Sequence, residues 1–112
     1  MRFDRLDRMN GGWFIGDFSP SALASKDFEV AVKHYRAGDC ESMHAHRIAT
    51  EVTVVIDGSV RMAGRTVRSG EIVVMQPGEA TAFVAITDCT TVCVKTPSVP
   101  GDKYICRVTD DR

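Results

Sequence analysis

The sequence predicts an all-β domain, built as a barrel or as a sandwich of two sheets. Short runs rich in valine, isoleucine and threonine recur along the chain, and tight turns with glycine separate them at 57–58, 63–64, 69–70 and 77–78. Short, evenly spaced strands of this kind are typical of barrels and sandwiches, whereas parallel βαβ units need helical segments between the strands. No segment with a convincing helical period competes, and 112 residues is the length of one domain.

The N-terminal part divides into a polar arm and a first apolar segment. Residues 1–12 are charged and end in Asn-Gly-Gly, which predicts a loosely held arm followed by a turn. Residues 13–15 predict an edge strand at the start of a barrel that extends over 13–106. Trp13 is the only tryptophan, and it either packs in the core or stacks on a ligand. Residues 19–24 form either one turn of helix or a loop.

Residues 28–35 alternate as a strand with two different faces. One face carries Phe28, Val30, Val32 and His34, and the other carries Glu29, Ala31, Lys33 and Tyr35. Residues two apart in a strand share a face, so only one of these sets can face the interior. If the first set does, His34 lies in the core or cavity; if the second does, Lys33 and Tyr35 line the cavity. The alternation alone does not choose.

The remaining strands follow in a regular series. One strand is predicted to carry His44 and His46, and others are predicted at 51–57, 60–62, 66–68, 72–75, 83–86, 91–95 and 103–106, the last at a sheet edge. The Asp57-Gly58 pair predicts a hairpin between the second and third of these. Residues 52–56 and 72–75 are apolar on both faces, so the face outside the barrel is expected to meet a second sheet or a second subunit. Residues 107–112 are expected to be frayed.

Composition and charge argue against several classes of protein. Lysine and arginine number 14 and aspartate and glutamate 15, so neither nucleic acid nor a membrane surface is expected as a partner. No apolar run approaches the roughly 20 residues that a membrane span needs, and the charged first residues do not resemble a secretory signal, so a cytoplasmic location is expected. The four cysteines form no C-x-x-C pair and are expected to be reduced, with Cys40 left as a residue that could lie near the functional site.

A His-x-His pair followed by a glutamate carries the clearest chemistry in the chain. His44 and His46 point to the same face of a strand because they are two residues apart. Glu51 begins the next run of β-branched residues, and its carboxylate joins the pair if the chain bends between Arg47 and Thr50. Two imidazoles and one carboxylate are the ligands of an open divalent-metal site, favoured by non-haem iron and compatible with manganese, nickel or zinc.

The spacing around these three residues resembles the first motif of the cupin superfamily. That motif has Gly, five residues, His-x-His, four residues, Glu, six residues and Gly, and it matches Gly38, His44, His46, Glu51 and Gly58. The resemblance implies a single-domain double-stranded β-helix, a jelly-roll barrel, with a metal ion held inside by His44, His46 and Glu51. It also implies a homodimer, since cupins commonly pair or exchange edge strands.

The chain departs from the second cupin motif at the position of the fourth ligand. That motif usually has Gly, five residues, Pro-x-Gly, two residues, His, three residues and Asn. Gly70 and Gly78 are in register, but Gln76 stands in the place of the Pro, Thr81 in that of the His and Ala85 in that of the Asn. The missing ligand either leaves an extra open coordination position for a substrate, or lowers metal affinity so far that the barrel holds only an organic ligand.

Two functional hypotheses follow from these motifs. The first is a small metal-binding cupin that acts on a small polar molecule as an oxygenase or isomerase; the second is a non-catalytic module that binds a sugar or another small ligand with weak or no metal. Glu79 could supply a compensating carboxylate. Candidates for hydrogen bonding or acid–base chemistry are Lys33, Tyr35, Thr81, Arg47, Lys95 and Tyr104. No P-loop, dinucleotide fingerprint or Ser-His-Asp arrangement supports other chemistry.

Overall fold

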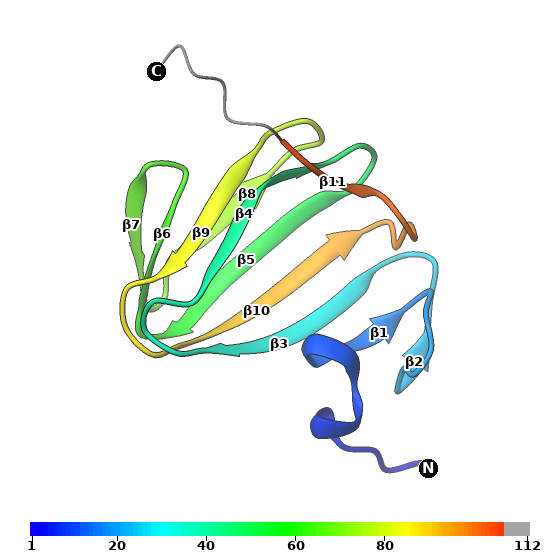
Figure 1. Cartoon of the computed structure of the whole chain (residues 1–112). Helices are drawn as coiled ribbons and strands as arrows, with labels where there is room; N and C mark the ends of the chain where they lie inside the picture. Colours follow the sequence, from blue (N-terminus) through cyan, green and yellow to red (C-terminus); the bar gives the residue numbers. More distant parts are fainter. Residues whose placement is uncertain (107–112) are drawn as a thin grey trace.

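Two β-sheets face each other in the computed structural model, which describes residues 1–106 (Figure 1). The predicted frayed segment 107–112 lies outside the described residues. The six-stranded sheet contains, in spatial order, β2 (Leu23–Ala24), β1 (Trp13–Gly16), β3 (Glu29–Tyr35), β10 (Cys89–Thr96), β5 (Thr50–Asp57) and β8 (Ile72–Met75). The five-stranded sheet contains β11 (Lys103–Ile105), β4 (Cys40–His46), β9 (Thr81–Ala85), β6 (Ser59–Met62) and β7 (Arg65–Arg68).

From β3 to β11 the chain passes back and forth between the two sheets. Each strand lies in the sheet opposite to its predecessor, except for the hairpin of β6 and β7. All strand pairs in this part of the chain are antiparallel. This alternation is the double-stranded β-helix, so the predicted fold class is confirmed.

The turn at Asp57-Gly58 does not close a hairpin, and that prediction was wrong. The strand before it, β5, pairs with β10 and β8, whereas β6 pairs with β7 and β9. The turn therefore carries the chain from one sheet to the other. Gly58 has a φ of 84°, and a Cβ atom there would lie 2.2 Å from the carbonyl oxygen of Asp88, so glycine is required by both the backbone and the close contact.

The N-terminal region is more ordered than the sequence indicates. The predicted edge strand, β1, lies between β2 and β3, because part of 19–24 forms the short strand β2 instead of a helical turn or loop. The arm 1–12 contains two 3₁₀ turns, η1 (Leu6–Arg8) and η2 (Asn10–Gly12). Gly12 packs so closely on β3 that a Cβ atom would lie 1.9 Å from the carbonyl oxygen of Val32. The predicted edge position of β11 is confirmed.

The inner faces of the two sheets form the hydrophobic core at one end of the barrel. Its buried members are Val55, Val60, Met62, Val67, Met75, Phe83, Ala85 and Cys89. On β3 the face with Ala31, Lys33 and Tyr35 points inward, while His34 is exposed and bonds to Thr90 across the strands at 3.0 Å. Of the two faces that the sequence pattern of 28–35 allows to point inward, the structure therefore places the one with Lys33 and Tyr35 toward the interior.

The outer face of the six-stranded sheet is apolar over four strands. Two rows of directly paired residues cross it: Val32, Val92, Val54 and Ile72 in one row, and Val30, Val94, Val52 and Val74 in the other. We call these eight residues the outer face. At its β8 end Ile72 is 62% and Val74 53% exposed. No helix in residues 1–106 is long and apolar enough to cross a membrane.

Candidate metal centre

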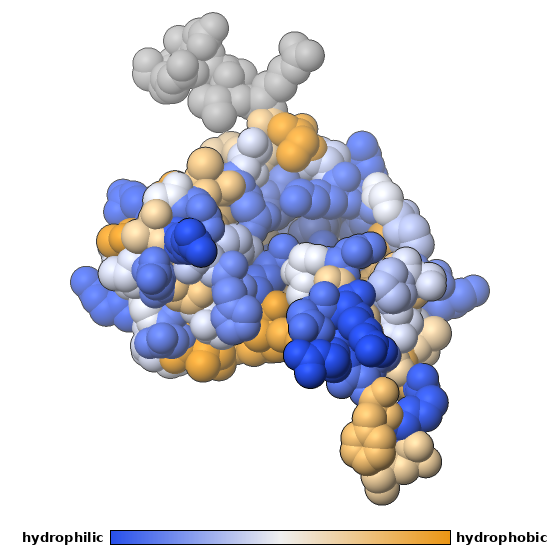
Figure 2. All heavy atoms as spheres, turned by 60° about the horizontal axis from the view of Figure 1, so that its bottom comes forward, coloured by the Kyte–Doolittle hydropathy of each residue, from blue (hydrophilic) through white to orange (hydrophobic). Residues whose placement is uncertain are grey.

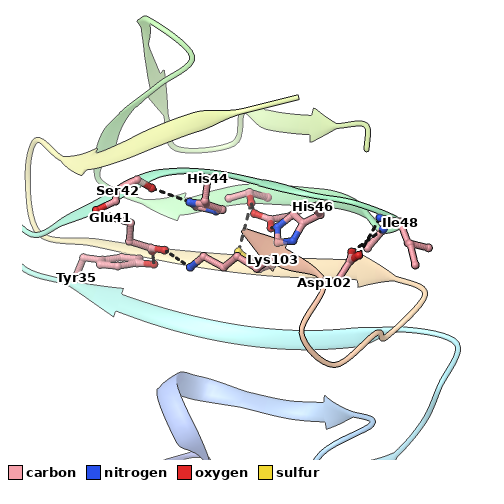
Figure 3. A network of polar contacts seen from close by, with 12 residues as sticks. Tyr35, Glu41, Ser42, His44, His46, Ile48, Asp102 and Lys103 are labelled. Atoms are coloured by element: carbon pink, nitrogen blue, oxygen red, sulfur yellow. Dashed lines mark hydrogen bonds and ion pairs between the residues drawn. The ribbon is translucent and has the colours of Figure 1, made fainter. Parts of the chain in front are cut away.

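β4 and the start of β5 bring His44, His46 and Glu51 together inside the barrel. Figure 3 shows the two histidines of this group. Each offers one ligand atom, and these three atoms all lie within 4.8 Å of one another. The side chains are withdrawn from water, since the residues are only 7%, 3% and 7% exposed. We call them the triad. The predicted convergence of two imidazoles and one carboxylate is therefore present in the structure.

Asp102 holds the bend that lets the triad form. Its two carboxylate oxygens accept hydrogen bonds from the backbone N–H groups of Ile48 and Ala49, both at 2.9 Å, and its own carbonyl accepts one from Arg47 at 3.2 Å. Asp102 is 6% exposed. A buried carboxylate from the loop before β11 thus fixes the turn between His46 and Glu51 (Figure 3).

His44 is oriented by the backbone of its own strand. Its Nδ1–H donates to the carbonyl oxygen of Ser42 at 2.9 Å. Because a carbonyl can only accept, Nδ1 carries the proton, and in the neutral ring Nε2 keeps a free lone pair. This is the arrangement that a metal-binding histidine needs, with one nitrogen fixed by a backbone acceptor and the other free to bind.

His46 and Glu51 bind each other directly. Nε2 of His46 donates to Oε2 of Glu51 at 2.7 Å, while Nδ1 of His46 is buried with no hydrogen-bond partner among residues 1–106. Burial opposes ionisation of Glu51, but the hydrogen bond from His46 and the positive charge of Lys95 outweigh it, so the pKa of the Glu51 carboxyl is lowered. The carboxylate is therefore ionised at neutral pH.

A cavity of about 140 Å³ opens beside the triad. Its lining combines charged residues, aromatic rings and small polar side chains: Trp13, Lys33, Tyr35, Glu41, His44, Glu51, Thr53, Met62, Phe83, Thr91, Cys93, Lys95 and Lys103. The face of the molecule drawn in Figure 2 is hollowed, and hydrophilic side chains border much of the hollow. Drug-sized ligands occupy pockets of about 300–1,000 Å³, so this cavity suits a smaller molecule.

A polar network crosses one wall of the cavity. The Tyr35 hydroxyl donates to Oε2 of Glu41, and Nζ of Lys103 lies 3.8 Å from Oε1 of the same carboxylate (Figure 3). Burial, together with the hydrogen bond to Glu41, raises the pKa of the Tyr35 hydroxyl. Tyr35 therefore remains protonated at neutral pH and acts as a hydrogen-bond donor.

Cys93 lines the cavity from β10, next to the triad. Its Sγ is 3.3 Å from the hydroxyl of Thr53, which also lies 3.3 Å from Oε1 of Glu51. Burial and the negative charge of Glu51 raise the pKa of the Cys93 thiol. Cys40 is exposed and is not part of the cavity lining.

The structure separates the other sequence-based candidates. Lys33, Tyr35 and Lys95 line the cavity. Thr81 pairs with His44 across the strands, but its hydroxyl accepts from the Ala63 N–H at 2.8 Å and donates to the Ala82 carbonyl at 2.6 Å. Its donor capacity is thus used by the backbone.

The remaining candidates lie away from the cavity. Glu79 is exposed and caps the backbone N–H of Gln76 at 2.8 Å. Arg47 lies over the ring of Tyr104, with its Cζ 4.5 Å from the ring centroid, and neither residue lines the cavity.

Sequence reasoning missed Glu41, Lys103, Cys93 and Asp102. Cys93 is two residues from Lys95 on one predicted strand face, so alternation along that strand relates the two. Glu41 lies three residues before His44, so alternation would place it on the opposite face, and the register shift between Glu41 and His44 in the pairing of β4 with β9 accounts for its place in the cavity lining. Lys103 and Asp102 come from the C-terminal region, and only the pairing of β11 with β4 brings them close.

The residues of the triad fit a divalent metal ion. The lone pair on Nε2 of His44, the ionised Glu51 carboxylate and the second imidazole form a donor set of nitrogen and oxygen. The unpartnered Nδ1 of His46 agrees with this, because a buried histidine with a purely structural role normally has its polar atoms satisfied.

Comparisons with known proteins support the fold. No protein-family model matches the sequence, and no curated protein matches it. An uncharacterised conserved protein with a double-stranded β-helix domain from Klebsiella pneumoniae superposes with a TM-score of 0.68 at 21% identity, over 75% of this chain and 74% of that one. An RmlC-like cupin protein from Desulfovibrio desulfuricans gives a TM-score of 0.60 at 20% identity, over 67% and 76%.

A third match is to an enzyme. DMSP lyase DddQ from Ruegeria pomeroyi gives a TM-score of 0.69 at 18% identity, and the match covers 83% of this chain but only 49% of that one. The chain is thus a double-stranded β-helix protein with a cluster of potential metal ligands inside the barrel. Its fold is the double-stranded β-helix that the resemblance to the first motif implies, and it is similar to the fold of the RmlC-like cupin protein.

Proposed function

We propose that this chain is a small metal-binding cupin that acts on a small polar molecule as an oxygenase or isomerase. The observation that carries the proposal is the convergence of the three triad donors, within 4.8 Å, at the wall of a cavity. The triad would hold iron, manganese, nickel or zinc in the divalent state. When bound, the ion would supply Lewis acidity or redox chemistry.

The polar network on the cavity wall supports the isomerase branch. Tyr35 is a permanent donor at neutral pH, and Glu41 is an acceptor beside it. Where a bound molecule takes the place of this hydrogen bond, Tyr35 can donate to its hydroxyl or carbonyl and Glu41 can exchange a proton with it at Oε2. Met62 and Phe83 line the same cavity, and their apolar side chains limit the access of water.

Metal analysis tests the proposal directly. Protein purified without added metal should contain a divalent ion in stoichiometric amount, and His44→Ala and Glu51→Gln should lose it. His34→Ala is the matched control, because His34 is an exposed histidine on β3 that bonds only to Thr90 among the described residues. Circular dichroism should show that all three variants are folded. A metal-free wild type that still binds a small ligand would favour the non-catalytic module instead.

Oxygen consumption separates the two enzyme branches. The metal-loaded protein is mixed with a panel of small polar molecules while dissolved oxygen is recorded. Consumption that depends on Glu51 supports the oxygenase, whereas turnover without consumption supports the isomerase. Loss of turnover in Tyr35→Phe, with the metal retained, would agree with a role of Tyr35 in holding the substrate.

We further propose a cytoplasmic homodimer. All four cysteines are free thiols, which agrees with a reducing compartment. The outer face presents eight apolar side chains on a sheet, and a second copy could cover it with the same surface.

A further inference from the structure

The inner face of the six-stranded sheet has a central row of small side chains between two rows that carry lysines. Ala31, Cys93 and Thr53 are directly paired across β3, β10 and β5, and we call them the central row. On one side of it Lys33 pairs with Thr91, and on the other Lys95 pairs with Glu51. Because the central row is small, space remains above it, and this space is part of the cavity.

Trp13 brings the two lysines together at this space. It pairs with Ala31 at the end of the central row, and its ring centroid lies 5.5 Å from Nζ of Lys33 and 4.6 Å from Nζ of Lys95. The negative face of an indole ring attracts ammonium groups and so holds both of them near the cavity. Two like charges are thereby kept beside one ring.

Neither ammonium group has a carboxylate within ion-pair distance in residues 1–106. The two carboxylates of the cavity are already engaged, Glu51 by His46 and Glu41 by Tyr35 and Lys103. Three lysines therefore face two carboxylates in the lining, and a divalent ion on the triad would add two further positive charges. A cleft lined with excess charge of one sign attracts ligands of the other sign.

We propose that the cavity takes a small organic carboxylate, with the carboxylate group held between Lys33 and Lys95 beside Trp13. The rest of the molecule then lies over the central row and reaches toward the triad. The small volume of the cavity, about 140 Å³, favours a short carboxylic acid over a nucleotide or an oligosaccharide. This inference rests on the proposed function, since it names the class of substrate for that site.

Calorimetric titration with malonate tests the assignment, with neutral malonamide as the matched probe and inorganic phosphate as the competing anion. Titrations are made on the full chain as purified and after treatment with a chelator, because malonate can also bind a metal ion directly. Malonate should bind in both states and malonamide should not. Equal binding of the two, or tighter binding of phosphate than of malonate, would overturn the assignment.

Variants of the two lysines locate the site. Lys33→Gln and Lys95→Gln should each weaken malonate binding about tenfold, the effect of losing one charge-assisted hydrogen bond at a partly exposed site. Lys26→Gln is the control, because Lys26 is exposed and does not line the cavity. Quenching or enhancement of the fluorescence of Trp13, the only tryptophan, should follow binding in the wild type. Unchanged affinity in both cavity variants would refute the site.

Metal content, measured on the same samples, distinguishes this inference from the proposed function. Malonate binding without any metal in the wild type would leave the carboxylate site standing and remove the metal centre. A stoichiometric metal without lysine-dependent malonate binding would support the metal centre and refute the carboxylate site.

Discussion

Asp102→Asn tests whether one buried carboxylate holds the bend between the triad ligands. Asparagine has nearly the same shape, but it keeps one acceptor oxygen and presents an NH₂ group to the second backbone N–H. Of the two bonds at 2.9 Å, to Ile48 and Ala49, one is therefore lost and the other loses its charge. A buried N–H without a partner costs about 1–3 kcal/mol, and a hydrogen bond to a charged group contributes about 1.5–3 kcal/mol.

We expect the free energy of unfolding to fall by about 2–4 kcal/mol, which is a large part of the 5–15 kcal/mol typical of a domain. For a chain of this length the melting temperature should fall by roughly 10–20 °C. Thermal unfolding followed by circular dichroism, with urea titration as a second measure, gives both quantities. Asp88→Asn is the matched control, because Asp88 also accepts a backbone N–H, that of Ala37 at 2.9 Å, but is exposed.

The same variant should weaken metal binding by about tenfold or more, as removal of groups that orient metal ligands commonly does. Titration of the folded Asp102→Asn protein with cobalt or zinc, well below its melting temperature, measures this effect. A melting temperature equal to that of Asp88→Asn would refute the energetic argument. A fall in stability with wild-type metal affinity would show that the bend does not position the triad.

Three further predictions follow from other parts of the chain. In urea titrations, Gly58→Ala should reduce the free energy of unfolding by at least about 2 kcal/mol more than Gly78→Ala does. Both glycines have a φ of 84°, but only Gly58 lacks space for a Cβ atom. Equal losses of stability in the two variants would contradict this reasoning. Val74→Lys should convert a homodimer into a monomer in sedimentation experiments, and a monomeric wild type would dismiss the outer face as an interface. Cys40, which is exposed, should react with a thiol reagent at neutral pH, whereas Cys93 should react only as the pH rises. Burial raises the pKa of the Cys93 thiol, so less of it is thiolate at any given pH. Comparable reaction rates of the two cysteines at neutral pH would contradict the burial of Cys93.

The fold could be predicted from local signals because they are repeated. Alternating residues and glycine turns recur along most of the chain, and a single error, such as the helical turn considered for 19–24, does not change the class. The turn at Asp57-Gly58 shows the limit of these signals. A turn sequence predicts that the backbone reverses, but the contacts of β5 with β10 and β8 decide which sheet receives the next strand.

The triad could also be predicted from a local signal, because its three members lie within eight residues of sequence. Lys95 shows what could not be predicted. Alternation places a side chain on a face of the sheet, but a shift of register by two residues keeps the face and changes every neighbour. Only the observed register of β10 against β5 makes Lys95 the partner of Glu51.

β5 connects the chemistry of the barrel to its stability. Its inward side chains are Glu51, Thr53 and Val55, which change along one strand from a metal ligand, to a small residue of the cavity, to a fully buried member of the core. Because these residues share one face and a fixed register, the hydrophobic core at Val55 also fixes the position of Glu51, four residues away on the same strand. The cost of burying the charge of Glu51 is offset locally by the hydrogen bond from His46 and the positive charge of Lys95, so the barrel can carry a charged site at one end without losing an apolar core at the other.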